Sequence, residues 1–491
     1  MYLSTLLREA ELKVRQIRGD AEISEICFDS RRARGGACFV AVSGSGDDGH
    51  KYIPSAIAGG CSSVVAQDAS GIPADIPFAI VDNTRAAVAM LAQTIRGWPS
   101  RKLVNVGITG TNGKSTTACL VRDILAATGH MPGLLGTITY QTGSTIVEAN
   151  QTTPDPVALA DMMAEMVAGG RTHLVMETSS HALDQDRTAG IDFRVAVFSN
   201  LTGDHLDYHK TMEAYLLAKA RLFEQLSADA HAVINQDDKA GPRLAKMTRA
   251  QTIMYGLSES ADLQARLIHM DASGTRFELA YRRAAQQAIV NSPMIGRHNV
   301  YNFLAAAGAC LGLGIDIEKV AAALGNVAAV PGRLERVPVQ APYSVFVDYA
   351  HTDDALVNVL GALRPVTKGR ILLVFGCGGD RDRSKRARMA KVAQQMADMV
   401  FVTSDNPRTE QPQAIIDEIV AGFEKKAAPG ICVEIDRRQA ISQAIGQACD
   451  GDIVLIAGKG HEKYQIIGRE KHHFDDVEVS REFMLSRGGQ P

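Results

Sequence analysis

The sequence predicts an α/β protein of three domains, and three observations support that class. The chain has 491 residues, which is too long for one ordinary hydrophobic core and suggests about three. Hydrophobic residues make up 46% of the chain and charged residues 22%, the balance of a globular protein. Short apolar stretches also alternate with amphipathic ones along most of the chain, which favours mostly parallel sheets covered by helices on both faces.

The first domain is expected over residues 1–99. Apolar strands are predicted at 38–42 and 63–66, with turns between them. The domain ends near Gly97-Trp98-Pro99, because glycine and proline interrupt regular structure.

The second domain is expected over residues 100–336. It opens with a strand at 103–109, a glycine-rich turn and a helix, in which Val121, Ile124 and Leu125 have the spacing of one helix face and Gly129 is a natural stop. Further strands are predicted at 173–176, 195–198 and 231–234. Prolines between 331 and 342 then indicate a hinge.

The third domain, residues 337–491, repeats the alternation. Strands are predicted at 371–375, 399–403 and 453–457, and helices at 385–396, 413–423 and 437–448, a Rossmann-like pattern. The glycine-rich turn after the first of these strands carries Arg381 where a dinucleotide-binding fingerprint needs its third glycine. This departure excludes a nicotinamide-dependent oxidoreductase.

Charge and cysteine usage exclude several other classes. The 55 acidic and 52 basic residues give a net charge of -3, so electrostatics provides no case for a nucleic-acid partner. We expect no membrane span and no export signal, because the chain lacks a long apolar run and a basic N-terminal region. The eight cysteines form no CxxC pair, which favours free thiols in the reducing cytoplasm over zinc or disulfides.

Residues 109–116, Thr-Gly-Thr-Asn-Gly-Lys-Ser-Thr, lie between the strand and the helix of the second domain. In this setting, backbone N–H groups and the helix N-terminus hold phosphate oxygens, Lys114 can reach the terminal phosphates and the Ser115 hydroxyl can bind Mg²⁺. The generic phosphate-loop motif has glycine where this chain has Ile108. A plain glycine-rich turn would explain neither Lys114 nor the hydroxyls, so we predict nucleotide binding by a P-loop ATPase-type sheet.

Two further side chains follow strands of the same sheet. Glu177 comes directly after an apolar run and His205 follows the next strand. Either residue alone is more often an ordinary loop residue, but ligands of open α/β sheets gather at the carboxyl ends of the strands. Together they predict a Mg²⁺ site opposite the phosphate loop.

The phosphate loop resembles that of the Mur ligases and the folylpolyglutamate synthetases. Other motifs that resemble Mur ligases occur in order along nearly the whole chain: residues 177–181 (ETSSH), 200–207 (NLTGDHLD), 296–299 (GRHN), 331–333 (PGR) and 348–351 (DYAH). The set is far more specific than any one motif. The sequence therefore resembles the Mur ligase family, and this resemblance implies an ATP-dependent acid–amino-acid ligase of peptidoglycan precursor synthesis that forms ADP and phosphate.

The resemblance also implies the partners of the reaction. These are ATP, UDP-N-acetylmuramoyl-L-Ala-D-Glu and meso-diaminopimelate. The last two would be joined through an acyl phosphate on the D-glutamyl carboxylate, with two Mg²⁺ ions as cofactor. The alternatives are a lysine-adding Mur ligase, a folylpolyglutamate synthetase or a regulatory P-loop ATPase. The 99 residues ahead of the second domain argue against the folate enzyme.

Site residues carried over from the resemblance fall into four groups. The catalytic group is Lys114, Lys219, Glu177 and His205. The ATP group is Gly110, Thr111, Asn112, Gly113, Lys114, Ser115, Thr116, His298, Asn299, Asn302, Arg333 and Asp348. The UDP-muramoyl-dipeptide group is Ser30, Thr152, Thr153, Ser179, Gln185 and Arg187. The diaminopimelate group is Arg381, Asp405, Asn406, Pro407, Arg408, Gly458 and Glu462.

The metal ligands implied by the resemblance are Ser115, Glu177, His205 and Lys219, the last as a carbamate (N6-carboxylysine). From the residues alone, Lys219 would be a solvated lysine on a helix, Ser30 part of an ordinary turn and Asn406-Pro407 a turn signal. The sequence alone does not decide between these interpretations and the roles implied by the resemblance.

Overall fold

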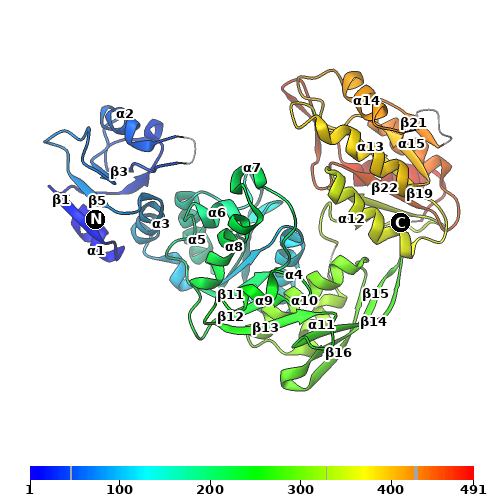
Figure 1. Cartoon of the computed structure of the whole chain (residues 1–491), viewed down its shortest axis with the longest axis horizontal. Helices are drawn as coiled ribbons and strands as arrows, with labels where there is room; N and C mark the ends of the chain where they lie inside the picture. Colours follow the sequence, from blue (N-terminus) through cyan, green and yellow to red (C-terminus); the bar gives the residue numbers. More distant parts are fainter. Residues whose placement is uncertain (45–46, 328, 425–429, 491) are drawn as a thin grey trace. The chain divides into compact units, whose positions relative to one another are not determined.

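The computed structural model describes residues 1–44, 47–327, 329–424 and 430–490. The chain forms two compact units (Figure 1): residues 1–264, 280–286 and 301–323 make up the first, and residues 265–279, 287–300 and 324–491 the second. Three sheets of the described residues carry helices between their strands, which confirms the α/β class. The domain boundaries at 99/100 and 336/337 stay predictions.

A small sheet occupies the start of the chain. Within the described part it has five strands in the order β1-β5-β4-β3-β2, and only β1 runs antiparallel to its neighbour. Its elements are α1 (Leu3–Glu9), β1 (Val14–Arg18), β2 (Glu25–Cys27), β3 (Ala37–Val40), α2 (Ile53–Ala58), β4 (Ser63–Ala66), β5 (Phe78–Val81) and α3 (Thr84–Ile95).

The central sheet follows the order β16-β15-β14-β13-β12-β11-β6-β10-β7-β8-β9 in the described ranges. Its strands are β6 (Val104–Thr109), β7 (Pro132–Leu135), β8 (Thr139–Gln141), β9 (Ile146–Glu148), β10 (His173–Glu177), β11 (Phe193–Phe198), β12 (His231–Asn235), β13 (Gln251–Gly256), β14 (Leu263–Asp271), β15 (Gly274–Tyr281) and β16 (Gln286–Ser292). The strands from β7 through β10, β6, β11 and β12 to β13 are parallel. Buried residues dominate them because helices cover both faces.

Helices of this part of the chain are α4 (Lys114–Ala127), α5 (Pro156–Ala168), α6 (Ser180–Asp184), α7 (Leu206–His209), α8 (Met212–Glu224), α9 (Gly241–Leu244), α10 (Arg297–Gly312) and α11 (Ile317–Gly325). The predicted strand–loop–helix around the phosphate loop is confirmed as β6 followed by α4. Parallel β6, β10 and β11 end at the same edge of the sheet, so the loops that follow them are neighbours there.

The third sheet belongs to the second unit and has the order β17-β18-β22-β19-β20-β21 among the residues described. All its strands are parallel except β17. Its elements are β17 (Glu335–Arg336), β18 (Ser344–Asp348), α12 (Asp353–Leu363), β19 (Ile371–Phe375), α13 (Ser384–Met396), β20 (Met399–Val402), α14 (Pro412–Ala421), β21 (Ile431–Val433), α15 (Arg437–Gln447), β22 (Ile453–Ala457) and α16 (Asp476–Ser486), with a hairpin of β23 (Tyr464–Ile467) and β24 (Glu470–His473).

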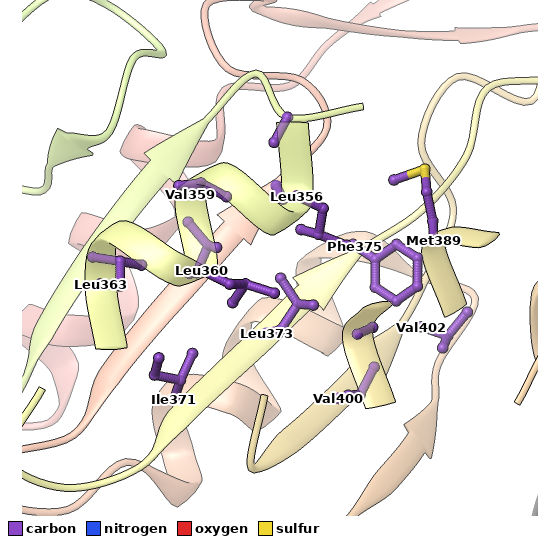
Figure 2. Packing of buried hydrophobic residues seen from close by; sticks show 14 of the residues in the cluster. Leu356, Val359, Leu360, Leu363, Ile371, Leu373, Phe375, Met389, Val400 and Val402 are labelled. Carbon is purple, nitrogen blue, oxygen red and sulfur yellow. The ribbon is translucent and has the colours of Figure 1, made fainter. Parts of the chain in front are cut away.

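Strand β19 shows why this sheet is stable. Ile371, Leu373 and Phe375 point to one face and pack with Leu356, Val359, Leu360 and Leu363 of α12 and with Met389 of α13 (Figure 2), whereas the residues between them pack on the opposite face. A strand whose alternate residues are buried on both sides requires helices on both faces of the sheet. Across the described residues, no helix combines the length and the apolar character needed to cross a membrane.

Candidate active site

The phosphate loop closes tightly against its neighbours. Gly110 has a φ of 148° and Gly113 a φ of 85°, conformations that side chains rarely adopt. A Cβ at Gly110 would overlap the Ser199 hydroxyl, and one at Gly113 would overlap the side-chain oxygen of Asn302. The structure thus brings Asn302 of α10, one of the predicted ATP residues, into contact with the phosphate loop.

Lys114 begins α4 and folds back over the loop. Its Nζ donates hydrogen bonds to the carbonyl oxygens of Gly110 (3.1 Å) and Thr111 (2.8 Å). The loop is also tied to the residues after β11: the Thr111 N–H donates to the Asn200 carbonyl at 2.8 Å, and the Asn112 N–H to its side-chain oxygen at 2.9 Å. The ammonium therefore lies where it can neutralise a phosphate bound by the loop.

Glu177 is the last residue of β10 and is buried. Its carboxylate accepts hydrogen bonds from the Ser115 hydroxyl at 3.0 Å and from the Thr137 N–H and hydroxyl at 2.7 and 2.9 Å. Sequence reasoning paired Ser115 with Glu177 but missed Thr137, whose only signal is its place just after β7. Oxygen donors of this kind suit Mg²⁺.

The described residues contain no group of three or more His, Cys, Asp or Glu side chains that could hold a metal. A Mg²⁺ ion at Glu177 would therefore need a further oxygen from Ser115, and a second ion would need the carboxylate of a modified Lys219. The residues present fit such an ion.

Lys219 lies on α8 and is only 1% exposed, so the expectation of a solvated helix lysine is wrong. Its Nζ donates to the Gly110 carbonyl at 2.8 Å and lies 4.3 Å from the centre of the Tyr215 ring. Burial, with a smaller effect from Lys114, lowers the pKa of Lys219 well below its ordinary value. Tertiary packing brought this lysine under the phosphate loop, which local sequence could not reveal.

His205 occupies the turn before α7 and is exposed, with a φ of 54°. Its ring lies 4.9 Å from that of His181 and 6.1 Å from that of Tyr215. Among the residues described, no hydrogen bond joins it to Glu177. The role of His205 at a metal stays a prediction.

The predicted dipeptide residues form one polar cluster beside Glu177. The Thr153 hydroxyl donates to the Glu177 carbonyl at 2.7 Å and accepts from the Ser179 N–H at 3.0 Å. Arg187 donates to the Thr153 carbonyl at 2.9 Å and to the Gln185 side-chain oxygen at 3.0 and 2.8 Å. A half-buried guanidinium among hydroxyls suits an anionic substrate.

Thr152 and Ser30 are the two remaining predicted dipeptide residues. Thr152 accepts a hydrogen bond from the Thr137 hydroxyl at 3.1 Å, which links the cluster to Glu177. Ser30 is the first residue of a short 3-10 helix (Ser30–Arg32) beside the small sheet, capped by Asp29, and is not part of the cluster.

The second unit carries the other predicted ATP residues. Asp348 ends β18 and accepts the N–H groups of Leu334 and Ala350 at 2.7 and 2.8 Å; burial raises its pKa although Arg333 opposes this. The Arg333 guanidinium lies 5.3 Å from the centre of the Tyr349 ring, and its Nε is buried with no hydrogen-bond partner among the described residues.

At the start of α10, His298 is exposed and Asn299 is buried, and the Asn299 amide donates to the Ile295 carbonyl at 2.8 Å. Their predicted contact with adenine stays a prediction, as does that of Asn302.

Six of the seven predicted amino-acid residues follow the carboxyl ends of β20 and β22, and Arg381 follows β19. Asn406 donates from Nδ2 to the Glu462 carboxylate at 2.7 Å, and its carbonyl accepts the Gly379 N–H at 2.9 Å. Gly458 packs so closely on Asp405 that a Cβ there would meet the carboxylate at 2.5 Å. The structure therefore brings these residues together, as expected for one site.

Arg408 has a φ of 52°, an uncommon conformation that costs on the order of 1–3 kcal/mol. The hairpin holds it there: the Arg408 N–H donates to the Ile466 carbonyl at 3.1 Å, and the Gly468 N–H to the Arg408 carbonyl at 2.8 Å. Its guanidinium donates to the Gly379 carbonyl at 2.9 Å. Pro407 is buried before it, and Arg381 is exposed on the facing loop.

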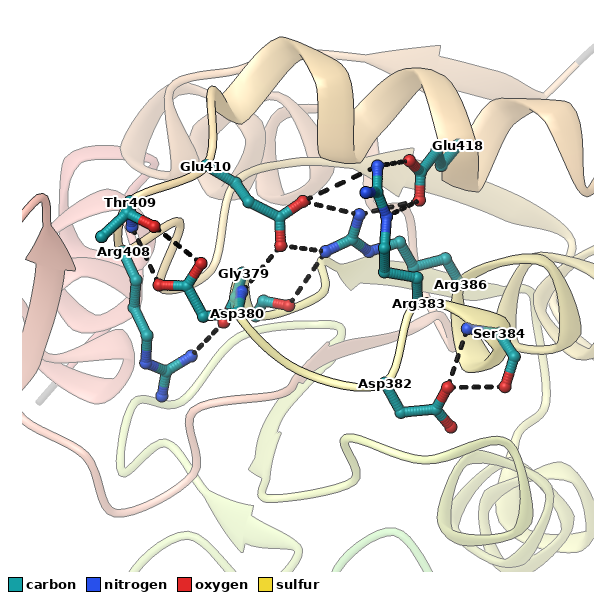
Figure 3. A network of polar contacts seen from close by, with 11 residues as sticks. Gly379, Asp380, Asp382, Arg383, Ser384, Arg386, Arg408, Thr409, Glu410 and Glu418 are labelled. Carbon is teal, nitrogen blue, oxygen red and sulfur yellow. Dashed lines mark hydrogen bonds and ion pairs between the residues drawn. The ribbon is translucent and has the colours of Figure 1, made fainter.

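An ion-pair network centred on the buried Arg386 braces these two loops (Figure 3). Arg386 of α13 is 1% exposed and binds Glu410 at 2.8 Å and Glu418 of α14 at 2.7 Å. Glu410 in turn accepts the Asp380 N–H at 2.7 Å. The loop carrying Arg381 and the loop carrying Arg408 are thus fixed to one helix pair.

Comparisons with known proteins agree with this arrangement. Residues 108–310 match the Mur ligase middle domain, and residues 332–460 match the Mur ligase glutamate ligase domain. The UDP-N-acetylmuramoyl-L-alanyl-D-glutamate--2,6-diaminopimelate ligase of Bacillus cereus is 45% identical over 472 residues, covering 95% of each chain. The ligase of the same name from Gloeobacter violaceus is 44% identical and covers 99% of each.

A solved structure carrying that same ligase name superposes with a TM-score of 0.71 at 33% identity, over 95% of each chain. The MurF ligase of Thermotoga maritima in complex with ADP, at 20% identity and a TM-score of 0.57, shares the fold. From the two domain matches and the near full-length similarity, the chain belongs to the Mur ligase family.

Proposed function

We propose that this Mur ligase joins meso-diaminopimelate to the D-glutamyl residue of UDP-N-acetylmuramoyl-L-Ala-D-Glu, with ATP converted to ADP and phosphate. The observation that carries the proposal is a cluster of charged side chains in the second unit, where Arg408 and Asp405 share the loop after β20 and Glu462, on the loop after β22, is joined to that loop through Asn406. A pocket with both charges suits an amino acid that brings a carboxylate and an ammonium. The names of the similar ligases support this substrate.

The chemistry solves the problem that a carboxylate is a poor acylating agent. The γ-phosphoryl group of ATP passes to an oxygen of the D-glutamyl carboxylate, ADP leaves, and an acyl phosphate forms. The substrate amine then attacks the carbonyl carbon, the tetrahedral intermediate loses phosphate, and the nitrogen gives up a proton. Lys114 is the cation of the phosphate loop that offsets charge on the transferring group, and Arg333 is a second cation assigned to ATP by the family resemblance.

Magnesium belongs to the proposal as cofactor, as two ions, and it would supply charge neutralisation at the phosphates. Ser115 and Glu177 would hold one ion and His205 with a carbamylated Lys219 the other. A neutral lysine nitrogen can attack the carbon of CO₂ and lose a proton, which leaves a carboxylate. The lowered pKa of buried Lys219 favours the neutral form of its amine, which this step requires.

We also propose that the reaction takes place in the cytoplasm, where ATP and the UDP-linked precursor would be available. All eight cysteines are free thiols, and six of them are buried, as suits a reducing compartment.

The test is phosphate release from ATP, measured with the UDP-muramoyl dipeptide and meso-diaminopimelate together, each alone, and neither. The ligase predicts rapid release only with both acceptors present, and a product whose mass is that of the two joined less one water. Steady ATP turnover that ignores both acceptors would instead indicate a regulatory P-loop ATPase.

A further inference from the structure

Lys459 is a buried cation to which the proposed reaction gives no role. It follows Gly458 after β22 and is completely buried. Its Nζ donates to the Asn406 side-chain oxygen at 3.0 Å and lies 3.8 Å from a carboxylate oxygen of Asp405 and 3.8 Å from one of Glu462. One ammonium therefore contacts three side chains of the proposed amino-acid pocket.

The contact with Asn406 decides which way its amide points. An ammonium has only donors, and the Ile466 N–H donates to the same Asn406 oxygen at 2.9 Å. With both donors on Oδ1, the NH₂ group must face the other way, where it donates to Glu462 at 2.7 Å. The second N–H of that group can donate to a carboxylate of the substrate.

The ammonium also separates two carboxylates. Burial lowers the pKa of Lys459, and Asp405, Asp476 and Glu462 oppose this while Arg437 adds to it. Burial and then Asp405 raise the pKa of Glu462, whereas Lys459 is the strongest influence that lowers it.

Other groups near Glu462 also lower its pKa, but each does so less than Lys459. The Asn406 amide and Arg408 also lower the pKa of Glu462. The Arg437–Asp476 pair is completely buried and joined at 2.7 Å, so each of these two charges already has its partner. Lys459 lies 3.8 Å from both carboxylates and is thus the cation that most favours the charged form of Glu462 beside Asp405.

We infer that Lys459 is a positioning residue for the amino-acid substrate: it fixes the orientation of the Asn406 amide and holds the side chains of Asp405 and Glu462 together, where they bind the ammonium at the distal centre of diaminopimelate. The inference rests on the proposed function. Lys459 itself lies beneath the pocket and acts through its three neighbours.

The test compares Lys459→Met with Lys368→Met, which removes the same charge from an exposed position of the same unit. In Lys459→Met we expect the KM for meso-diaminopimelate to rise roughly tenfold or more, the effect of losing hydrogen bonds to a charged group, while the KM for ATP stays within about twofold. Lys368→Met should match the wild type in both. An unchanged KM for diaminopimelate, or an equal rise for ATP, overturns the inference.

A pH profile separates this role from a merely structural one. Without Lys459 the pKa of Glu462 rises further, so the carboxylate is lost at a higher pH than in the wild type. The KM of Lys459→Met for diaminopimelate should therefore fall as the pH rises, more steeply than the KM of the wild type does. Parallel pH profiles of the two proteins would contradict the inference.

Lys459→Gln serves as the second variant, because it can still donate to Asn406 but carries no charge. It should show the altered pH profile with a smaller rise in KM, and it decides the question if Lys459→Met does not fold. A wild-type protein that does not use diaminopimelate would refute the proposed function instead, and that result is visible before any variant is made.

Discussion

At the residue scale, the charged side chains of the candidate site are held by partners far away in the sequence. Lys219 reaches the carbonyl of Gly110, and Glu177 is held by Ser115 and Thr137. The motif at the phosphate loop could be predicted because its function depends on consecutive residues. The burial of Lys219 could not, since it depends on how α8 packs under a loop more than a hundred residues earlier.

Lys114 tests the nucleotide site. We expect Lys114→Ala to reduce phosphate release and ligation on the order of 100-fold or more, because the transferring phosphoryl group loses a positioned cation. The variant should still fold, since the Lys114 side chain is only half-buried and its ammonium donates to loop carbonyls rather than filling a hydrophobic core. Circular dichroism and ligation rates, with exposed Lys102→Ala as control, check this; near wild-type ligation by folded Lys114→Ala would refute the assignment.

Lys219 tests the proposed carbamate. Lys219→Ala should lose most activity, and a short carboxylic acid added to the assay should restore part of it by placing a carboxylate in the vacated space. Lys219→Arg should also be inactive, because its guanidinium keeps the charge and does not form the carbamate. Full activity of Lys219→Arg would exclude the modification.

Arg408 tests the amino-acid pocket. Its planar guanidinium can bind the distal carboxylate of diaminopimelate through two hydrogen bonds, which lysine as a substrate could not offer. Arg408→Ala should therefore raise the KM for diaminopimelate steeply and that for ATP little. Arg408→Lys keeps the charge but not the planar pair of donors, so its KM for diaminopimelate should lie between those of the wild type and Arg408→Ala. A wild-type KM for diaminopimelate in Arg408→Ala would contradict this role.

At the scale of elements, the buried strands were the most predictable features. The strands expected at 371–375 and 453–457 have those bounds as β19 and β22, because continuous apolar runs are characteristic of strands buried on both faces. Helix α14 ends at Ala421, short of the predicted 423. The antiparallel strands β8 and β9 were missed, since their short and partly exposed segments carry little periodicity.

The helix pair α13–α14 makes a prediction of its own. Arg386→Met should lower the free energy of unfolding by about 3 kcal/mol, near the low end for a broken buried ion pair, because Glu410 and Glu418 keep some contact with solvent. Urea unfolding followed by circular dichroism measures it. Activity should also fall, since the loops of Arg381 and Arg408 lose their brace.

The pH dependence of that effect has a defined sign. Arg386, by hydrogen bonding, is the main cause that lowers the pKa of Glu410 from 4.5 to about 2. A carboxylate with a lowered pKa stabilises the fold fully above its unfolded value and loses that contribution as the pH falls. The difference in unfolding free energy between wild type and Arg386→Met should thus be largest above pH 4.5 and shrink as the pH falls toward about 2. A difference independent of pH would contradict the assignment.

At the scale of the whole molecule, the sequence motifs and the fold both indicate the Mur ligase family. Motifs spread over both units predicted a Mur ligase, and the three sheets and the two domain matches confirm the family. What the motifs could not predict are the supporting contacts, such as Thr137 at Glu177 and Lys459 beneath Asn406, because these depend on tertiary packing.

The central claim is that this ligase selects meso-diaminopimelate, and the most direct measurement is kcat/KM for meso-diaminopimelate and for L-lysine under identical conditions. Lysine lacks the distal carboxylate and would leave Arg408 and the Asn406 amide without that partner in a partly desolvated pocket. The account predicts a ratio on the order of 100-fold or more in favour of diaminopimelate, as expected when hydrogen bonds to charged groups are lost. Equal values, or a preference for lysine, would contradict it.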